Sequence, residues 1–378
     1  MKTSARTRLA LTTGLALFAM FFGAGNMIFP LQLGMQAGSH VVTAIIAFVI
    51  TGVGFPFLGL FAVSLYNGDY WKFFAPLGKP AALLITGFLI FILCLTVGAP
   101  RTELVTYHTI IGGGASLGFF GNPFVFAFIY FAIVYVMVLN QRHVVNIIGW
   151  FFSPIKIMAF ILLVLVGVHF ASPFLPSHAS VFHVAQTGLM TGYGTMDLLA
   201  AVFFATIAYK NIKRKCHAHG LKDKDSITKI SLYSCLVGAL LIALIYSGLI
   251  IVAAMHAKAM AGTPTAALIG KISEVLLGRY GFIFVSICVT FACLATAAAL
   301  TEAGMDFFME RVFTKQRISR KWLLLIILAL MYMAASFGFD KIMGFAIPIL
   351  SVLYPCLIIY CIFCIIKKAR RKKLKATS

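Results

Sequence analysis

Long apolar runs, separated by short polar segments, recur from one end of the chain to the other. Each run approaches or exceeds the ~20 residues that an α-helix needs to cross the hydrocarbon core of a membrane. The runs lie near residues 9–35, 41–65, 80–104, 123–139, 144–170, 188–209, 227–255, 279–307, 322–337 and 341–366. This pattern predicts an all-α polytopic membrane protein with about ten transmembrane helices.

Basic residues are distributed unevenly among the segments that separate these runs. With the N-terminus in the cytoplasm, 26 of the 31 lysines and arginines fall on or next to cytoplasmic segments and 5 on outer segments. Because lysine and arginine are enriched in cytoplasmic loops, this alternation predicts that both termini lie in the cytoplasm.

The composition is typical of a chain that is embedded in lipid throughout. Of 378 residues, 61% are hydrophobic and 11% are charged, and the mean hydropathy is +1.00. This leaves no room for a separate soluble domain. We expect one transmembrane domain over residues 1–366 and a basic cytoplasmic tail over residues 367–378. The net charge of +21 lies in short loops and in this tail, where it suits the lipid bilayer rather than nucleic acid.

Two of the predicted helices carry poor helix formers in mid-membrane. The first span contains FFGAGNMIFP at residues 21–30, and the sixth contains TGYGTMD at residues 191–197. With five spans in each half, residues 9–170 and 188–366 would run in opposite directions across the membrane. Interrupted helices at corresponding positions of two inverted halves are typical of secondary transporters, whose binding site lies between the breaks.

The residues of the first break suggest what it binds. Pro30 has no N–H and crowds the carbonyl of Asn26, while Gly23 and Gly25 lower the cost of leaving helical geometry. The exposed carbonyls suit a cation, the exposed N–H groups suit a carboxylate, and the Asn26 side-chain oxygen could join the cation shell. The alternative is a proline kink that serves packing alone. The matching cluster in the sixth span favours the functional interpretation.

Asp197 is a carboxylate in mid-membrane, where such groups usually face a cavity or a partner. One interpretation is that it binds or couples a cation. The other is that it caps the second half of the sixth span, where free N–H groups would stabilise its charge. The two roles are compatible, and both remain open from the sequence.

The eighth span places Ala292, Ala295 and Thr296 on one helical face. This face either supplies a hydroxyl to a site or simply allows two helices to pack closely.

For each of two pairs of charged residues, the sequence allows two interpretations of their role. Arg101 and Glu103, near the outer boundary, form either a local ion pair or a gate; Glu302 and Asp306 pair with Arg311 or with the basic loop. The sequence contains no P-loop, HExxH or GxSxG motif, so we do not expect an enzyme.

Four segments resemble one family. GLALFAMFFGAGNMIFPLQLGMQAG (14–38) and GYGTMDLLAA (192–201) are similar to the first- and sixth-helix motifs of bacterial branched-chain amino acid:cation symporters, the BrnQ-type carriers. GAPRTELVTY (98–107) and ACLATAAALT (292–301) resemble their third and eighth helices. The resemblance implies a leucine-transporter-like fold, a 5+5 inverted repeat with helices 1 and 6 broken, in the bacterial cytoplasmic (inner) membrane. Members usually have twelve helices, and we expect the ten-helix core to be sufficient for transport.

The resemblance also implies site residues. In that fold a sodium ion lies between the unwound part of helix one and helix eight, which points to Phe21, Ala24, Ala292 and Thr296 as sodium ligands, with Asp197 binding or coupling a cation. The implied substrate-binding residues are Gly23, Gly25, Asn26, Tyr193, Gly194 and Thr195. A second hydroxyl is expected beside Thr296, but position 295 is an alanine.

The implied function is secondary active import of leucine, isoleucine and valine by cation symport, through alternating access. The alternative is a proton-coupled carrier for a broader set of apolar amino acids, methionine included, that uses Asp197. A third interpretation is a receptor that binds but does not transport. No cofactor is expected; the partners are the amino acid, a coupling cation (Na⁺ or H⁺) and the bilayer.

Overall fold

The computed structural model describes residues 2–112, 118–177, 179–218, 223–313 and 318–377. Throughout these residues every regular element is a helix, which confirms the predicted all-α class. Six helical stretches are long and apolar enough to cross a membrane, and two shorter apolar helices, Pro123–Leu139 and Pro154–His169, accompany them. Many large apolar side chains, such as Leu84, Phe128 and Val352, are exposed on the outside of the bundle, as contact with lipid requires.

The helices of the described residues group into ten spans. The first five spans are α1 (Lys2–Phe21) with α2 (Ala24–Ala37); α3 (Val41–Val49) with α4 (Phe55–Ser64); α6 (Lys79–Ile90) with α7 (Pro100–Gly112); α8 (Pro123–Leu139); and α9 (Gln141–His169). The second five are α10 (Val181–Gly194) with α11 (Asp197–Ala218); α12 (Lys224–Met255); α13 (Leu268–Phe307); α14 (Arg320–Ala335); and α15 (Phe339–Thr377). The short helix α5 (Tyr70–Phe74) follows α4, and η7 (Phe308–Val312) follows α13.

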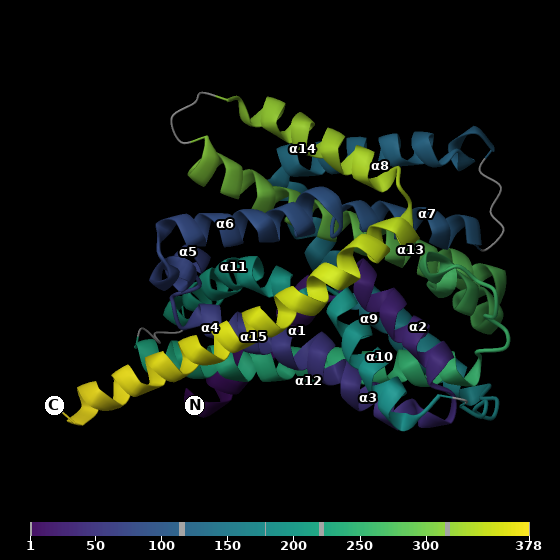
Figure 1. Cartoon of the computed structure of the whole chain (residues 1–378), viewed down its shortest axis with the longest axis horizontal. Helices are drawn as coiled ribbons and strands as arrows, with labels where there is room; N and C mark the ends of the chain where they lie inside the picture. The colour runs from purple at the N-terminus through teal and green to yellow at the C-terminus, as the bar shows by residue number, and fades with distance from the viewer. Residues whose placement is uncertain (1, 113–117, 178, 219–222, 314–317, 378) are drawn as a thin grey trace.

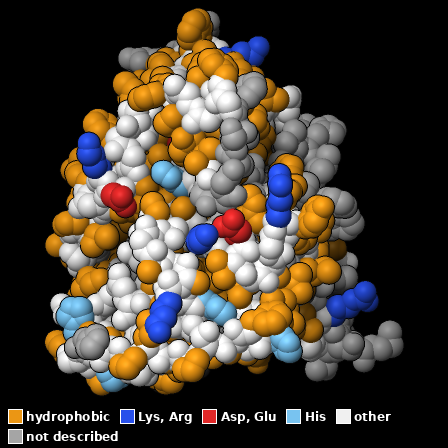
Figure 2. Space-filling model, turned by 90° about the vertical axis from the view of Figure 1, so that its right-hand side faces the viewer, with side chains coloured by type: hydrophobic (Ala, Val, Ile, Leu, Met, Phe, Trp, Pro, Cys, Tyr) orange, Lys and Arg blue, Asp and Glu red, His pale blue; other side chains and the backbone are white. Residues whose placement is uncertain are grey.

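Both chain ends lie at the same end of the bundle. Figure 1 shows the N and C labels near the lower left, with α5 on the same left-hand side. Figure 2 looks onto the opposite, right-hand end, where hydrophobic and uncharged atoms dominate and charged side chains are scattered singly. Both termini at one end of the bundle agree with an even number of crossings, and the cytoplasmic orientation of that end stays a prediction.

Both predicted interruptions are present. The first span breaks between Phe21 and Ala24, and the sixth breaks between Gly194 and Asp197. Gly23, in extended geometry, precedes the first residue of α2, and Met196 in the second break adopts a left-handed φ of 64°. A left-handed backbone at a non-glycine residue is uncommon and indicates that the surrounding structure imposes it.

Pro30 does not make the first break, which corrects the sequence prediction. It is buried inside α2, seven positions beyond Gly23, and the helix continues through it to Ala37. The break instead lies at Gly23, whose backbone N–H donates to the side-chain oxygen of Asn26 at 3.1 Å. A side-chain acceptor therefore takes the place of a helical carbonyl at the start of α2.

The third span is longer than predicted and is also interrupted. Its helical run over 79–112 extends eight residues beyond the predicted end, and Val97–Ala99 leave regular geometry between η4 (Phe91–Thr96) and α7. The segment around Gly98 thus places Arg101 inside the bundle rather than at its outer boundary. The sixth span begins at Val181, seven residues earlier than predicted, and α15 continues as a helix through the predicted tail.

Candidate substrate and cation site

A small cavity lies where the first, third, sixth and eighth spans meet. Its lining residues surround both breaks and come from the helices that face them: Met20, Phe21, Gly23, Ala24, Asn26, Leu93, Gly98, Arg101, Thr102, Thr195, Met196, Asp197, Ala200, Phe204, Thr296 and Leu300. The cavity has a volume of about 20 Å³, enough for about one water molecule. The structure therefore represents a closed conformation, which has to open before it admits an amino acid.

Asn26 and Asp197 join the two breaks. The Asn26 amide donates to the Asp197 carboxylate at 2.5 Å and also to the Tyr246 hydroxyl on α12. Tyr246 in turn donates to the same carboxylate oxygen at 3.2 Å. All three side chains are buried. The Asn26 side-chain oxygen accepts the Gly23 N–H, and its predicted place in a cation shell stays a prediction.

Asp197 is the first residue of α11, where the positive end of the helix dipole favours a carboxylate. Its hydrogen-bond partners are side chains of α2 and α12, so the carboxylate connects three helices besides stabilising its own helix terminus. The backbone N–H of Asp197 donates to the Thr195 hydroxyl at 3.4 Å. The side chain of Thr195, rather than that of Asp197, thus receives an N–H at the start of α11.

Arg101 reaches the second break. Its two terminal nitrogens donate to the carbonyl oxygens of Gly194 and Thr195, each at 2.5 Å. These carbonyls end α10 and lack helical partners, so a planar guanidinium satisfies both at once. Arg101 is buried and attracts Asp197 electrostatically, and the structure, which describes both residues, shows no ion pair between Arg101 and Glu103; the alternative of a gate stays a prediction.

Two glycines of the first break allow this close approach. A Cβ at Gly23 would lie 2.7 Å from the Thr296 hydroxyl, and a Cβ at Gly25 would lie 2.7 Å from Nη2 of Arg101. Side chains at either position would displace the third or eighth span. The glycines are therefore required as much for contact between spans as for the break itself.

Comparison with known proteins gives the family. Residues 6–377 match the family model described as "Branched-chain amino acid transport protein". The chain belongs to this family.

Its relatives are similar over most of their length. The transporter is 30% identical over 385 residues to branched-chain amino acid permease BraB of Bacillus subtilis (strain 168), covering 99% of this chain and 83% of that protein. It is 27% identical over 354 residues to branched-chain amino acid permease BrnQ of Escherichia coli (strain K12), covering 93% and 78% respectively. These relatives are named as permeases and not as enzymes, in agreement with the sequence prediction.

The fold is shared with a solved transporter. The crystal structure of MhsT in complex with L-phenylalanine superimposes with a TM-score of 0.62 at 19% identity, over 92% of this chain and 87% of that one. At this identity the likeness establishes the leucine-transporter-like fold, which is the fold class predicted from the sequence.

Tyr193 and Gly194 lie outside the central cavity. The Tyr193 ring packs against Tyr354 of α15, with ring centroids 4.5 Å apart. Gly194 lines a second cavity of about 300 Å³ together with Phe29 and polar residues such as His183 and Gln186 near the start of α10. Phe29 borders this outer cavity and lies 5.6 Å from the Arg101 guanidinium, which lines the central one. Phe29 and Arg101 therefore separate the two cavities.

Two residues of the predicted sodium site are hydrogen-bonded to each other, and a lysine binds the end of α1 next to it. The Thr296 hydroxyl donates to the carbonyl of Ala292 at 3.0 Å. The ammonium of Lys156, on α9, donates to the carbonyl of Phe22 at 2.8 Å and approaches that of Ala19 at 3.4 Å. Lys156 is buried, whereas the sequence placed it near the cytoplasmic start of the fifth span. The end of α1 is thus bound by a lysine of this chain.

The sequence contained a signal for each residue that was misplaced. Gly98 and Pro100 lie just before Arg101 and mark an interruption of the third span. The span resumes as α7, and this places Arg101 inside the bundle. Lys156 lies twelve residues into the predicted 144–170 span, too deep for a loop-facing position. A charged residue at such depth indicates a buried partner, which here is backbone carbonyl.

Glu302 was assigned correctly to the basic loop. Its carboxylate pairs with Arg320, the first residue of α14, at 2.6 Å. Glu103 is buried beside Thr102 and forms no ion pair with any of the residues described.

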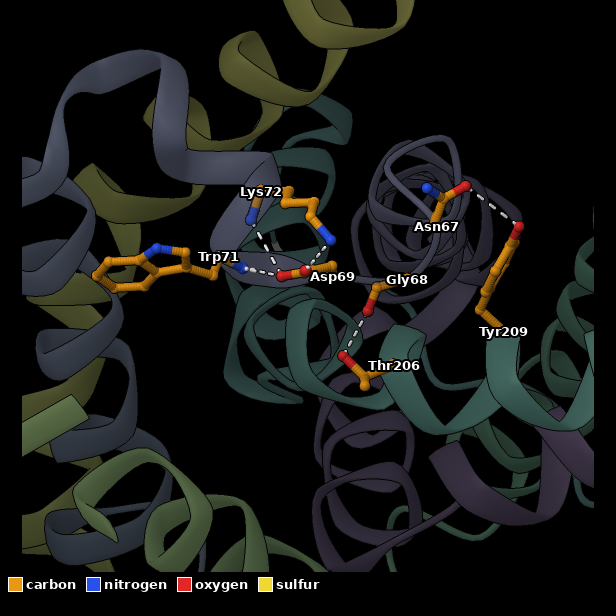
Figure 3. A network of polar contacts seen from close by, with 7 residues as sticks. All are labelled: Asn67, Gly68, Asp69, Trp71, Lys72, Thr206 and Tyr209. Carbon is orange, nitrogen blue, oxygen red and sulfur yellow. Dashed lines mark hydrogen bonds and ion pairs between the residues drawn. The ribbon is translucent and has the colours of Figure 1, made fainter. Parts of the chain in front are cut away.

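The segment between α4 and α5 is attached to α11. Figure 3 shows the Thr206 hydroxyl donating to the Gly68 carbonyl, at 2.5 Å, and Tyr209 donating to the side-chain oxygen of Asn67, at 3.3 Å. Gly68 has a φ of 70°, and a Cβ there would lie 2.5 Å from Cβ of Tyr209. Asp69 then caps α5 by accepting the backbone N–H groups of Trp71 and Lys72. This loop therefore holds the second half of the broken sixth span in place.

Removing one of these bonds tests the attachment. We expect Thr206→Val to lower the thermal midpoint of the detergent-solubilised protein by about 2 °C, because one net hydrogen bond contributes about 1 kcal/mol. Thr290→Val is the matched control, since the Thr290 hydroxyl bonds only to Ser286 of its own helix. Equal midpoints for the two variants would show that the loop contact does not stabilise the fold.

Proposed function

We propose that this protein imports leucine, isoleucine and valine together with a cation, by alternating access, across the bacterial cytoplasmic (inner) membrane with both termini inside. The central cavity between two broken helices carries this proposal. It brings together an arginine, an aspartate and free backbone groups, which are the partners that an amino acid's two charged ends require.

The charged ends of the substrate have complementary partners on opposite sides of the cavity. The carboxylate would bind at the start of α2, where the backbone at Gly25 lies close to the Arg101 guanidinium. The ammonium would bind near the Asp197 carboxylate. The family resemblance implied Gly23, Asn26, Tyr193 and Gly194 as substrate-binding residues, and in this proposal they keep the two breaks in place.

The aliphatic side chain has an apolar wall to contact. Met20, Phe21, Leu93, Phe204 and Leu300 are apolar residues that line the cavity. When these side chains move apart, the cavity would accommodate the side chain of leucine, isoleucine or valine. Burying that side chain would contribute about 25 cal/mol of binding free energy per Å² of apolar surface. A polar side chain would find no hydrogen-bond partner there, which favours apolar amino acids.

Two contact zones would close the cavity in turn. On the outer side, rotation of Phe29 away from Arg101 would connect the central cavity to the cavity of about 300 Å³. On the inner side, separation of α1 and α11 from the loop at Asn67–Gly68 would open a path to the cytoplasm. The two non-helical breaks would act as the hinges of these movements.

Uptake by purified protein in liposomes tests the proposal. We expect labelled leucine to enter the vesicles. Isoleucine and valine should inhibit this uptake at similar concentrations, whereas lysine and glutamate should not inhibit it at any concentration. Strong competition by methionine would support the alternative of a broader apolar range. Liposomes that bind leucine but never take it up, under any imposed ion gradient, would favour a receptor.

A further inference from the structure

We propose that Lys156 takes the place of a sodium ion at the end of α1, so that this transporter is driven by protons carried on the Lys156 amine. The inference deepens the proposed function and depends on it. It stands on the position of the Lys156 side chain and on the loss of an oxygen ligand from the facing helix, two observations from different spans.

The Lys156 ammonium binds backbone carbonyls at the end of α1, next to those that were predicted as sodium ligands. It donates to the carbonyl of Phe22 at 2.8 Å and lies 3.4 Å from that of Ala19, at the frayed end of α1. It also lies 5.4 Å from the centroid of the Phe22 ring, which adds a cation–π attraction. A buried ammonium has three donors to satisfy, and these carbonyls have no helical partner.

The remaining atoms cannot hold a sodium ion there. A hard cation needs several oxygen ligands, and Ala295 supplies none where the fold calls for a hydroxyl. The Thr296 hydroxyl and the Ala292 carbonyl are hydrogen-bonded to each other. A second positive charge beside the ammonium would also be repelled. The residues present therefore do not fit sodium, contrary to the sequence expectation.

The surroundings of Lys156 leave its charge without a carboxylate counterion. From α13 the thiols of Cys288 and Cys293 face it, and from α12 the Tyr246 ring lies beyond Phe22, with centroids 6.4 Å apart. In the described part of the chain, no aspartate or glutamate forms an ion pair with it. An ammonium whose hydrogen-bond partners are carbonyls can lose its proton without leaving an unpaired carboxylate behind.

Proton balance follows from the position of Lys156. The neutral amine takes one proton from water on the outer side, and the resulting ammonium binds the α1 carbonyls and holds the inner side closed. When α1 moves after the amino acid has bound, the ammonium reaches cytoplasmic water and gives one proton to it. Only an N–H bond forms and breaks, and one proton enters with each amino acid.

Leucine accumulation in liposomes separates this proposal from sodium coupling. Under a pH difference of one unit, inside alkaline, we expect wild-type protein to accumulate leucine about tenfold, whether sodium or choline is present. A pH-sensitive dye inside the vesicles should record one proton per leucine. We expect Lys156→Gln to exchange leucine across the membrane but to reach only equal concentrations. Lys156→Arg should bind leucine and likewise not accumulate it, because its guanidinium does not release a proton. Lys341→Gln, at an exposed lysine of α15, is the matched control and should behave as wild type.

Three results would overturn the proposal. The first is leucine accumulation that is driven by a sodium gradient and not by the pH difference. The second is leucine entry through the wild-type protein with no accompanying proton entry. The third is proton-driven leucine accumulation by both Lys156 variants. The first and third would leave the proposed amino-acid import intact. A wild-type protein that moves no leucine in exchange or uptake would instead contradict the proposed function itself.

Discussion

Arg101→Met is expected to reduce leucine uptake about a hundredfold or more. The substitution keeps much of the side-chain volume but leaves the carbonyls of Gly194 and Thr195 unpaired in the protein interior. Each unpaired buried group costs about 1–3 kcal/mol, and the charge opposite Asp197 is lost as well. Since each 1.4 kcal/mol corresponds to a factor of ten, two carbonyls alone account for the predicted loss.

Initial rates of leucine uptake in liposomes provide the measurement. Arg279→Met is the matched control, because Arg279 is exposed at the opposite end of the bundle from the chain termini, and it should retain wild-type rates. Arg101→Lys should be intermediate, since one ammonium cannot match the forked geometry of a guanidinium on two carbonyls. If Arg101→Met transports leucine at the wild-type rate, the second break does not need this side chain.

Local sequence determined the spans and the breaks, but not the contacts between them. The apolar runs and the glycines at 23 and 194 predicted two interrupted helices at inverted positions, because helix propensity and burial are local properties. Pro30 was given too much weight: a proline inside a helix removes one backbone hydrogen bond, and α2 continues past that loss to Ala37. Asn26, a side chain that replaces a backbone acceptor, decides where α2 begins.

Arg101 and Lys156 show why the site was only partly predictable. Both were counted as loop-facing residues, since lysine and arginine in a membrane protein usually mark a boundary. Their partners are backbone carbonyls 93 or more positions away in the sequence, exposed only because distant helices break. Every residue has a backbone carbonyl, so no sequence pattern reveals which carbonyl is the partner. The two broken helices and the two buried cations therefore form one arrangement: each cation satisfies the carbonyl end of one break.

Asp197→Asn is expected to weaken leucine binding and to leave proton coupling in place. The amide keeps the size of the side chain and one acceptor for Asn26 or Tyr246, but it removes the charge that we propose pairs with the substrate ammonium. Losing one partner of such a buried pair costs about 2 kcal/mol or more, which corresponds to about thirtyfold in apparent Kd.

Binding and accumulation should respond differently in this variant. The affinity for leucine falls, yet the steady-state accumulation under a pH difference of one unit stays near the wild-type ratio, because the accumulation ratio depends on the number of protons carried and not on affinity. Asp340→Asn, at an exposed aspartate of α15, is the matched control for both measurements. An Asp197→Asn protein that equilibrates leucine but no longer accumulates it would place the coupling proton on Asp197, as the alternative interpretation of the sequence had it. Retained accumulation in Asp197→Asn, together with its loss in Lys156→Gln, would assign substrate binding to the carboxylate at the second break and coupling to the lysine at the first.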